Sequence, residues 1–245
     1  MSSPRTAIRE GERPGAHPPS EQYLEAILTL EEEGSQVIQA RLAETVGHSA
    51  PTVSEMVQRL RSSGYIDIEG RLLHLTASGR ELAASVTRKH RLAECLLTQI
   101  IGLPWHKVHA EADRWEHVIS DEVEARLVDL LGDPTTCPHG NVIPGNGHCP
   151  EASLVLSQAR PGDLVRLSRI SAFLEPDTEA LAYLEQHGFT PGAQARVAAQ
   201  GPDGSLVLET PTASIVVGAQ FAELMFYVPV EEPSDHVAET AERAG

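Results

Sequence analysis

Near the start of the chain, three apolar stretches with helical spacing are separated by glycine breaks and followed by two short β-type runs. Ser20 precedes the first stretch as an expected helix cap, and Gly34 ends that helix. A short amphipathic segment over Gln39–Val46 closes at Gly47, and a third helix follows a turn. Short helices around a glycine turn, followed by a hairpin, predict a winged helix-turn-helix over residues 20–75. A small helical core with a hairpin lid is the alternative interpretation.

The third expected helix has a polar outer face. It carries Pro51 near its first turn and ends at Ser62-Ser63-Gly64. Its outward side chains are hydrogen-bonding residues suited to phosphates and base edges, so we expect this region to bind double-stranded DNA. The candidate DNA-binding residues are Arg41, Ser49, Pro51, Thr52, Ser54, Glu55, Gln58 and Arg59.

Beyond the expected hairpin, the pattern changes from helical to β-type. Residues 76–101 read as one long helix, and a second runs from Pro104 to about Leu131. Both are rich in Leu, Ile and Val, so we expect them to pack against a second copy of the chain in a homodimer. From Gly162 onward, short β-type runs surround one helix over Asp177–Gln186, which predicts a small β-barrel.

Composition limits the classes of protein to which this chain can belong. A net charge of −16 over 245 residues argues against a nonspecific nucleic-acid coat protein, but residues 36–75 balance four arginines against four acids. No apolar run approaches the ~20 residues that span a bilayer, and no signal-peptide core is present, so we expect a cytoplasmic protein without membrane contact. An odd count of three cysteines fits a reduced compartment.

Histidines and acidic or amide side chains recur at helical spacing in three segments. In residues 109–117, four of them are separated by steps of four, three and one, so a helix puts them on one stripe. Imidazole with carboxylate is the ligand mix that binds Mn, Fe(II), Co, Ni or Zn. Single charged pairs usually decorate a solvated helix face, but three such groupings favour metal binding. The candidate ligands are Gln22, Glu25, His90, Glu94, His109, Asp113, Glu116 and His117.

Several stretches together resemble one known family. They are Tyr23–Gly34, Ser49–Ser54, Lys89–Glu94, Arg114–Glu124 and His139–Gly145. In order and spacing they strongly resemble the diphtheria-toxin-repressor family of metal-dependent regulators, over about residues 20–145. Beyond residue 160 the likeness is looser and matches an SH3-like third domain. The resemblance implies a dimeric repressor with two metal sites per subunit, which binds operator DNA when loaded with Fe(II) or Mn(II) and represses metal-uptake genes.

The expected fold is therefore mainly α with a β C-terminal domain. The expected domains are a flexible arm (1–19), a winged helix-turn-helix DNA-binding domain (20–75), a helical metal-binding and dimerisation domain (76–145), a linker (146–160), an SH3-like small β-barrel (161–231) and an acidic tail (232–245).

The resemblance also divides the candidate ligands between two sites. His90, Glu94 and His109 match the ancillary site of iron-type members, and Glu116 and His117 match the primary site. The remaining primary-site positions decide the metal preference. Iron-type members have a methionine at the position of Gln22 and a cysteine at that of Asp113, whereas manganese-type members have carboxylates at both positions and a glutamate at that of Glu25.

Loss of the thioether and the thiol hardens the primary site, so we expect Mn(II) to be favoured and Fe(II) to remain possible. Gln22 supplies one neutral carbonyl oxygen and should bind weakly, the alternative being that it faces solvent. In the third domain, the two further iron-type ligands fall on Ala172 and Glu175. Alanine cannot bind a cation, whereas Glu175 either reaches the metal or is a solvated acid. Glu55 replaces a glutamine of iron-type members, so we expect a different operator sequence.

Two other function classes remain as alternatives: a metal-independent winged-helix regulator, and a metallohydrolase built on His90, His109 and His117. The chain has neither a nucleophile elbow nor a phosphate-binding glycine loop, so we do not expect an enzyme.

The cysteines raise a separate question. Cys137, His139, His148 and Cys149 are potential Zn ligands, but their spacing fits no common finger and favours a loop with incidental polar residues. Cys95 lies among leucines and is expected to be a buried core thiol.

Overall fold

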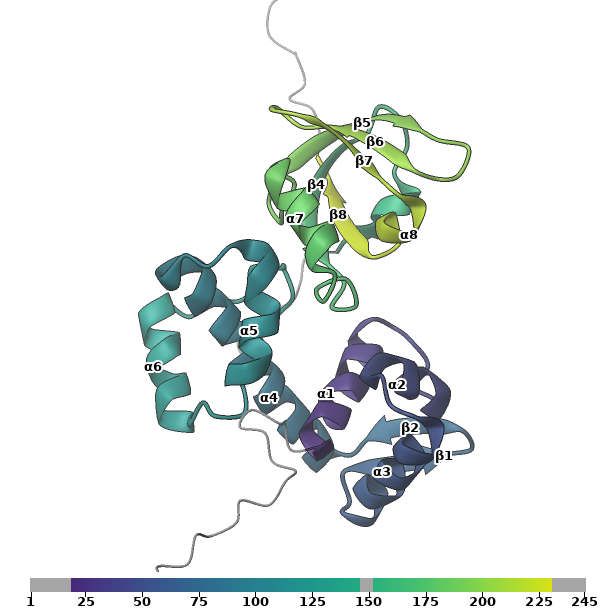
Figure 1. Ribbon diagram of the computed structural model, residues 1–245, viewed down its shortest axis with the longest axis vertical. Coiled ribbons are helices and arrows are strands. Elements are labelled where there is room, and N and C mark those ends of the chain that lie inside the picture. The colour runs from purple at the N-terminus through teal and green to yellow at the C-terminus, as the bar shows by residue number, and fades with distance from the viewer. Residues whose placement is uncertain (1–18, 146–151, 231–245) are drawn as a thin grey trace, which may run out of the picture. The chain divides into compact units, whose positions relative to one another are not determined.

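The chain divides into two units, Met1–His148 and Cys149–Gly245, in the computed structural model (Figure 1). The structure describes residues 19–145 of the first unit and 152–230 of the second. The expected acidic tail and all but the last residue of the expected arm lie outside the described residues. Within the described ranges, no helix has the length and apolar character needed to cross a membrane.

Three helices and an antiparallel hairpin form the N-terminal part of the first unit. Apolar side chains from all five elements bury one core, which includes Leu24, Leu42, Val57 and Leu73. This arrangement confirms the expected winged helix-turn-helix. The elements are α1 (Pro19–Glu32), α2 (Gln39–Val46), α3 (Ala50–Ser62), β1 (Ile66–Glu69) and β2 (Leu72–Leu75).

The turn between α2 and α3 follows from local chemistry. Gly47 ends α2 in the left-handed conformation (φ 68°), which a residue without a Cβ adopts at low cost. Two residues later, the Ser49 hydroxyl accepts a hydrogen bond from the backbone N–H of Thr52 and caps α3. Val53, Val57 and Leu60 then point into the core, which leaves the polar face of α3 outside.

Helix α4 (Ala77–Leu96) links the winged part to the helices that follow it. It packs against α1, against α5 (Val108–Trp115) and against α6 (Asp121–Leu131). Near its start, a Cβ on Gly79 would lie 1.9 Å from the carbonyl oxygen of Tyr65, so only glycine permits this close approach to the segment before β1. A π-helical turn (Leu97–Ile101) continues α4, as expected for one long helix over 76–101.

The expected single helix from Pro104 to Leu131 is wrong. A 3₁₀ turn (Trp105–Lys107) leads into α5 (Val108–Trp115), and α6 (Asp121–Leu131) starts anew after a break. The Ser120 hydroxyl accepts from the backbone N–H of Val123, and acids fill the first turn of α6, so the break has its own start signal. Glu116 and His117 consequently lie at the end of α5 and not within a continuous helix.

The second unit contains a six-stranded antiparallel sheet in the order β3-β8-β4-β5-β6-β7. This sheet confirms the expected β C-terminal domain. Its first strand, β3, pairs with β8. This strand lies within the segment that was expected to be a linker. The elements are β3 (Leu154–Val155), a 3₁₀ turn (Leu156–Gln158), β4 (Leu164–Ile170), α7 (Thr178–Gln186), β5 (Gln194–Gln200), β6 (Leu206–Glu209), β7 (Ser214–Val217), α8 (Ala219–Ala222) and β8 (Met225–Pro229).

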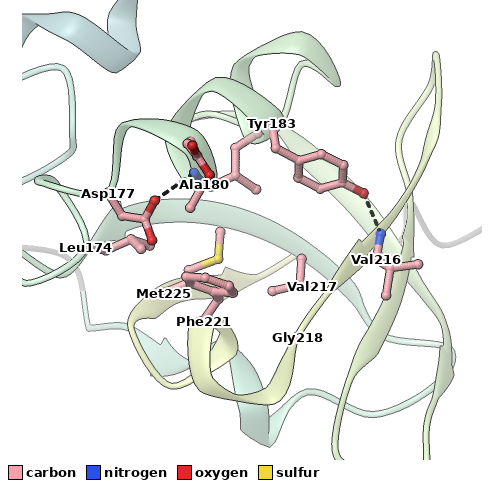
Figure 2. Close-up of a pocket in the computed structure, with 11 residues that line it drawn as sticks. Leu174, Asp177, Ala180, Tyr183, Val216, Val217, Gly218, Phe221 and Met225 are labelled. Carbon is pink, nitrogen blue, oxygen red and sulfur yellow. Dashed lines mark hydrogen bonds between the residues drawn. The ribbon is translucent and has the colours of Figure 1, made fainter.

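A cavity of about 340 Å³ lies in this second unit between α7, β7 and α8 (Figure 2). The Tyr183 hydroxyl accepts a hydrogen bond from the backbone N–H of Val216 and joins α7 to β7 beside it. Leu174, Phe221 and Met225 line the cavity, so its wall is largely apolar.

Candidate metal centre

His90 on α4 is the central side chain of the candidate site. Its Nδ1 atom lies 2.6 Å from Oε2 of Glu116, and its Nε2 atom lies 3.1 Å from Oε1 of Glu94 and 3.1 Å from Nδ1 of His109. The ring is buried. The two nitrogens of one imidazole therefore face two different groups of potential ligands.

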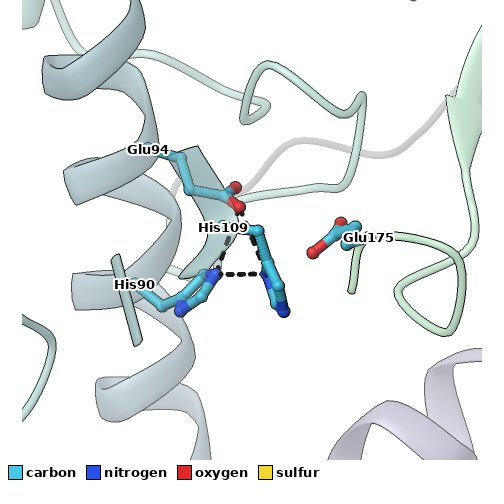
Figure 3. A group of neighbouring side chains, drawn as sticks. All are labelled: His90, Glu94, His109 and Glu175. Carbon is cyan, nitrogen blue, oxygen red and sulfur yellow. Dashed lines mark hydrogen bonds and ion pairs between the residues drawn. The ribbon is translucent and has the colours of Figure 1, made fainter. Parts of the chain in front are cut away.

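The first group consists of His90, Glu94 and His109. Each offers a ligand atom, and these atoms lie within 4.8 Å of one another (Figure 3). His90 and Glu94 are four residues apart on α4, so the helix places both on one side, and His109 comes from the first turn of α5. The structure thus brings together the three residues that were expected to form the ancillary site within this unit.

The second group consists of Glu25, His90 and Glu116, whose ligand atoms again lie within 4.8 Å of one another. Glu25 belongs to α1 of the winged part, whereas His90 and Glu116 belong to the helical part. Asp113, on α5, approaches His90 with an Oδ1–Nδ1 distance of 3.4 Å. The group therefore joins side chains from both parts of the first unit.

His117 lies beside this second group. Its Nε2 atom is 2.9 Å from Oε1 of Glu116, and its Nδ1 atom is 2.7 Å from Oε2 of Glu21. Glu21 was not among the residues expected from the sequence. It stands four positions before Glu25 on α1, so the same helical spacing argument would have found it. The expected residue Gln22 is half buried on the same helix.

Burial and charge shift the pKa values of these groups in opposite directions. Burial alone would raise the pKa of Glu116, but hydrogen bonds with His117 and His90 hold it at about 2. Burial would likewise lower the pKa of His90, but the carboxylates of Glu94 and Glu116 raise it well above its usual value. Burial raises the pKa of Glu25 to about 8, helped by the negative charge of Glu116.

The donor set fits a divalent cation. Imidazole nitrogens and carboxylate oxygens converge in a buried site, and the imidazoles of His90 and His117 both face the carboxylate of Glu116. The Oε2 atom of Glu94 is buried and has no hydrogen-bond partner in the described part of the chain. A buried carboxylate oxygen without a partner is costly in the protein alone and is satisfied by a bound metal.

His139 departs from the expectation of an incidental loop residue. Its side chain is completely buried, and its Nδ1 atom lies 3.0 Å from Oε1 of Glu94. Cys137 is also buried and belongs to a group with Glu94 and His139. His148 and Cys149 lie outside the described residues. Cys95 is buried, as expected of a core thiol.

Glu175 and Ala172 belong to the second unit, in the turns between β4 and α7. The assignment of Glu175 as a ligand stays a prediction.

The candidate DNA-binding side chains lie on the surface of α2 and α3. All eight residues, from Arg41 to Arg59, are exposed, whereas the intervening Val53 and Val57 are buried. An exposed polar face on the second helix of a helix-turn-helix suits contact with a DNA groove. Their role as DNA contacts stays a prediction.

Three domain families match the chain. The iron-dependent repressor N-terminal DNA-binding domain matches residues 18–72, and the iron-dependent repressor metal-binding and dimerisation domain matches residues 76–145. The FeoA domain matches residues 154–228. The matches follow one another along the chain with short gaps between them.

Known proteins show the same likeness over most of the chain. The iron-dependent repressor IdeR of Mycobacterium leprae is 42% identical over 209 residues, which cover 78% of this chain and 88% of that protein. The diphtheria toxin repressor of Corynebacterium diphtheriae is 54% identical over 127 residues, 51% of this chain and 56% of that protein.

Solved structures agree with the sequence relatives. A manganese-dependent transcriptional repressor in complex with manganese aligns with a TM-score of 0.76 at 33% identity, covering 86% of this chain and 100% of that one. ScaR with bound Zn²⁺ aligns with a TM-score of 0.73 at 27% identity, covering 87% of this chain and 100% of that one.

Proposed function

The chain belongs to the family of iron-dependent repressors, as its likeness to the diphtheria-toxin-repressor family predicted, and on this premise we propose that it represses transcription by binding DNA as a metal-loaded homodimer. The observation that carries the proposal is the grouping of Glu25 with His90 and Glu116. Side chains from the winged part and from the helical part meet in that group, so one bound cation links the two parts.

This link supplies a reason for DNA binding to depend on metal. A ligand that binds one arrangement of two parts more tightly than others shifts the population toward that arrangement. We infer that the favoured arrangement is the one in which the two α3 helices of a dimer meet successive major grooves, ~34 Å apart. Each cation also neutralises carboxylates in a chain of net charge −16, which lessens its repulsion from DNA.

We assign two metal sites to each subunit. The primary site comprises Gln22, Glu25, Asp113, Glu116 and His117, and the ancillary site comprises His90, Glu94 and His109, with Glu175 as a further ligand from the second unit. The neighbours that Glu116 has in this group offer imidazole nitrogens and carboxylate oxygens, which supports Mn(II) as the favoured metal and Fe(II) as a second one. Glu175→Gln should weaken binding at the ancillary site alone.

Exposed apolar side chains support dimerisation through the helical part. Val118 is 76% exposed and Leu130 59% exposed, and Ile100, Ile101 and Val123 are also open to solvent. These residues all lie within the matched metal-binding and dimerisation domain. Exposed large apolar side chains favour burial against a second copy.

The DNA contacts are assigned to the outer face of α3 with Arg41 from α2. Glu55 lies on that face and is exposed; its carboxylate is repelled by phosphates but accepts a hydrogen bond from the amino group of a cytosine. The proposed repressor is loaded, and therefore active, when the metal concentration is high. Repression of metal-uptake genes would then limit further uptake of the metal, so we propose these genes as its targets.

The test is DNA binding by metal-stripped and metal-loaded full-length chain. Operators would be selected from random duplexes both with chelator and with Mn(II), and their affinities measured by fluorescence anisotropy with Mn(II), Fe(II) and Zn(II) in parallel. We expect specific binding only with metal. Equal affinity for the selected operator in chelator would instead identify a metal-independent winged-helix regulator.

A further inference from the structure

One hydrogen bond connects the first helix of the winged part to the turn between α2 and α3. The hydroxyl oxygen of Tyr23, on α1, lies 2.8 Å from Nδ1 of His48. His48 stands between Gly47, which ends α2, and Ser49, which caps α3. Tyr23 is buried in the core of the winged part, whereas His48 is exposed. The DNA contacts assigned above include neither of these two side chains.

The surroundings of Tyr23 decide the direction of this hydrogen bond. Burial raises the pKa of the Tyr23 hydroxyl, so the group keeps its proton. Within the described residues, the hydroxyl has no hydrogen-bond partner other than His48. A buried hydroxyl proton without an acceptor is costly, so the hydroxyl donates and Nδ1 of His48 accepts. A neutral imidazole that accepts at Nδ1 carries its proton on Nε2, which makes Nε2 a donor.

The turn holds this donor at the edge of the surface assigned to DNA. The backbone N–H of His48 donates to the carbonyl oxygen of Ala43 at 3.2 Å, which ties the turn to α2. The next side chain, Ser49, is exposed, and its hydroxyl lies 2.8 Å from that of Thr52 on α3. Nε2 of His48 has no partner in residues 19–145 and 152–230, so it is available to a ligand from outside the chain.

Tyr23 and the metal-facing acid Glu25 lie on opposite sides of α1. They are two positions apart, which corresponds to about 200° around an α-helix. The carboxylate of Glu25 groups with His90 and Glu116, whereas the ring of Tyr23 packs in the winged core. A single helix therefore carries a candidate metal ligand on one side and the hydrogen-bond partner of His48 on the other.

We propose that Nε2 of His48 donates a hydrogen bond to a phosphate of the DNA backbone, and that Tyr23 is a positioning residue that orients the imidazole for this contact. Hydrogen bonds to phosphates fix the register and orientation of a protein on the duplex. The inference rests on the proposed function, because the contact requires α3 to lie in a DNA groove. It also deepens that function, since any shift of α1 on metal binding would reach the phosphate contact through Tyr23.

The test compares operator affinity among full-length chains loaded with Mn(II): the wild type, His48→Ala, Tyr23→Phe and the double variant. His48→Ala should lose about 10-fold, the scale of one hydrogen bond to a charged acceptor. Tyr23→Phe should lose about 3-fold, because the imidazole remains but is no longer held in place. The double variant should lose no more than His48→Ala does, because Tyr23 acts through the imidazole.

Two further variants serve as controls. His48→Gln keeps a side-chain donor and should recover part of the lost affinity. Tyr65→Phe removes a hydroxyl from a partly buried side chain that packs on the same core, and it should bind the operator normally. Circular dichroism and Mn(II) binding to the DNA-free chain, measured by electron paramagnetic resonance, should be unchanged in every variant of His48.

Neutral methylphosphonates, placed at one backbone position of the operator at a time, identify the phosphate. One position in each half-site should weaken binding by the wild type and leave binding by His48→Ala unchanged. A general loss of structure would instead weaken the variant without removing its sensitivity to any one position.

The outcomes separate the inference from the proposed function. Equal sensitivity of the wild type and His48→Ala at every position overturns the phosphate contact, and additive losses in the double variant overturn the role of Tyr23. Both results leave the proposed function intact if Mn(II) still activates DNA binding. A His48-dependent position in a chain that binds the operator equally well in chelator supports the contact and overturns the metal-dependent function instead.

Discussion

Oε2 of Glu21 lies 2.7 Å from Nδ1 of His117, and this ion pair joins the first helix of the winged part to the segment that follows α5. Glu116 lies 2.9 Å from the other nitrogen of the same imidazole. When it is protonated, His117 thus donates to two carboxylates from different parts of the fold. A cation that binds Glu116 and His117 takes the place of the His117 proton, and the negative charge of Glu21 beside that imidazole then favours the bound cation.

The first prediction concerns Glu21. Glu21→Ala should reduce Mn(II) affinity by more than Gln22→Ala does, because Glu21 is the acid of α1 that contacts His117. Mn(II) titrations followed by operator anisotropy would give both affinities. Glu44→Ala, an exposed acid on α2, is the matched control and should leave the affinity unchanged. A larger loss with Gln22→Ala would restore Gln22 as the principal ligand from α1.

The second prediction concerns Glu116. Glu116→Ala should abolish activation by Mn(II), because Glu116 faces His90 and His117 and holds a pKa of about 2 as a buried anion. Gln22→Ala should weaken activation only ~10-fold, the scale of one modest ligand. Operator binding across a Mn(II) series measures both effects. A normal Mn(II) response in Glu116→Ala would refute the assigned primary site.

The third prediction concerns metal selectivity. Asp113→Cys should shift preference toward Fe(II) or Co(II), since a thiolate softens the site that Asp113 keeps hard. The wild type should be activated by Mn(II) at least as well as by Fe(II). Parallel anaerobic titrations with the three metals provide the comparison, with Asp113→Asn separating loss of charge from gain of sulfur. An unchanged ratio of Mn(II) to Fe(II) affinity in Asp113→Cys would exclude Asp113 from the site.

The fourth prediction follows from the raised pKa values. Burial raises the pKa of Glu25 to about 8, and the carboxylates of Glu94 and Glu116 raise that of His90 well above its usual value, so Glu25 and His90 carry protons near pH 7 before a metal binds. A metal binds their deprotonated forms, so its affinity should rise as pH increases toward 8. Calorimetry in buffers of different ionisation enthalpy should show release of about one proton or more per Mn(II). Binding without proton release would contradict the proposed ligands.

The fifth prediction concerns the dimer. Val118→Glu and Leu130→Glu should each shift the metal-loaded chain toward monomer, because they place a charge on the exposed apolar surface of the helical part. Sedimentation velocity at roughly tens of micromolar, where even a weak specific interface is populated, measures the change. Val216→Glu is the matched control, since Val216 is 57% exposed but lies in the second unit. An unchanged dimer in the first two variants would place the interface elsewhere.

Much of the fold could be predicted from local pattern. Three features depend only on neighbours within a few residues: the cap at Ser49, the left-handed Gly47 and the alternation over residues 66–75. The local sequence is therefore enough to predict each of them. The same holds for His90 and Glu94, whose four-residue spacing alone puts them on one side of a helix. The family likeness then supplied the pairing of these residues with α5.

The remaining features depend on contacts between distant segments. The break after Trp115 was missed because the apolar spacing of α5 and α6 runs almost continuously, although Ser120 and the acids after it mark a new helix start. His139 reaches Glu94 only because two arginines on α4 hold the loop carbonyls. The spacing of residues in the sequence does not predict that contact. The sequence analysis therefore interpreted His139 as an incidental loop residue, although its side chain is buried beside a potential ligand.

The close approach of Gly79 to the Tyr65 carbonyl has a mechanical consequence. His90 stands eleven positions after Gly79 within one unbroken helix, a rise of about 16 Å. Because Gly79 has no side chain, the backbone of α4 lies directly against the backbone at Tyr65, where the hairpin begins. We therefore expect α4 and the hairpin to rotate together as one rigid body. A tilt of about 10° at His90 then displaces the hairpin by roughly 3 Å, the difference between touching a phosphate and missing it.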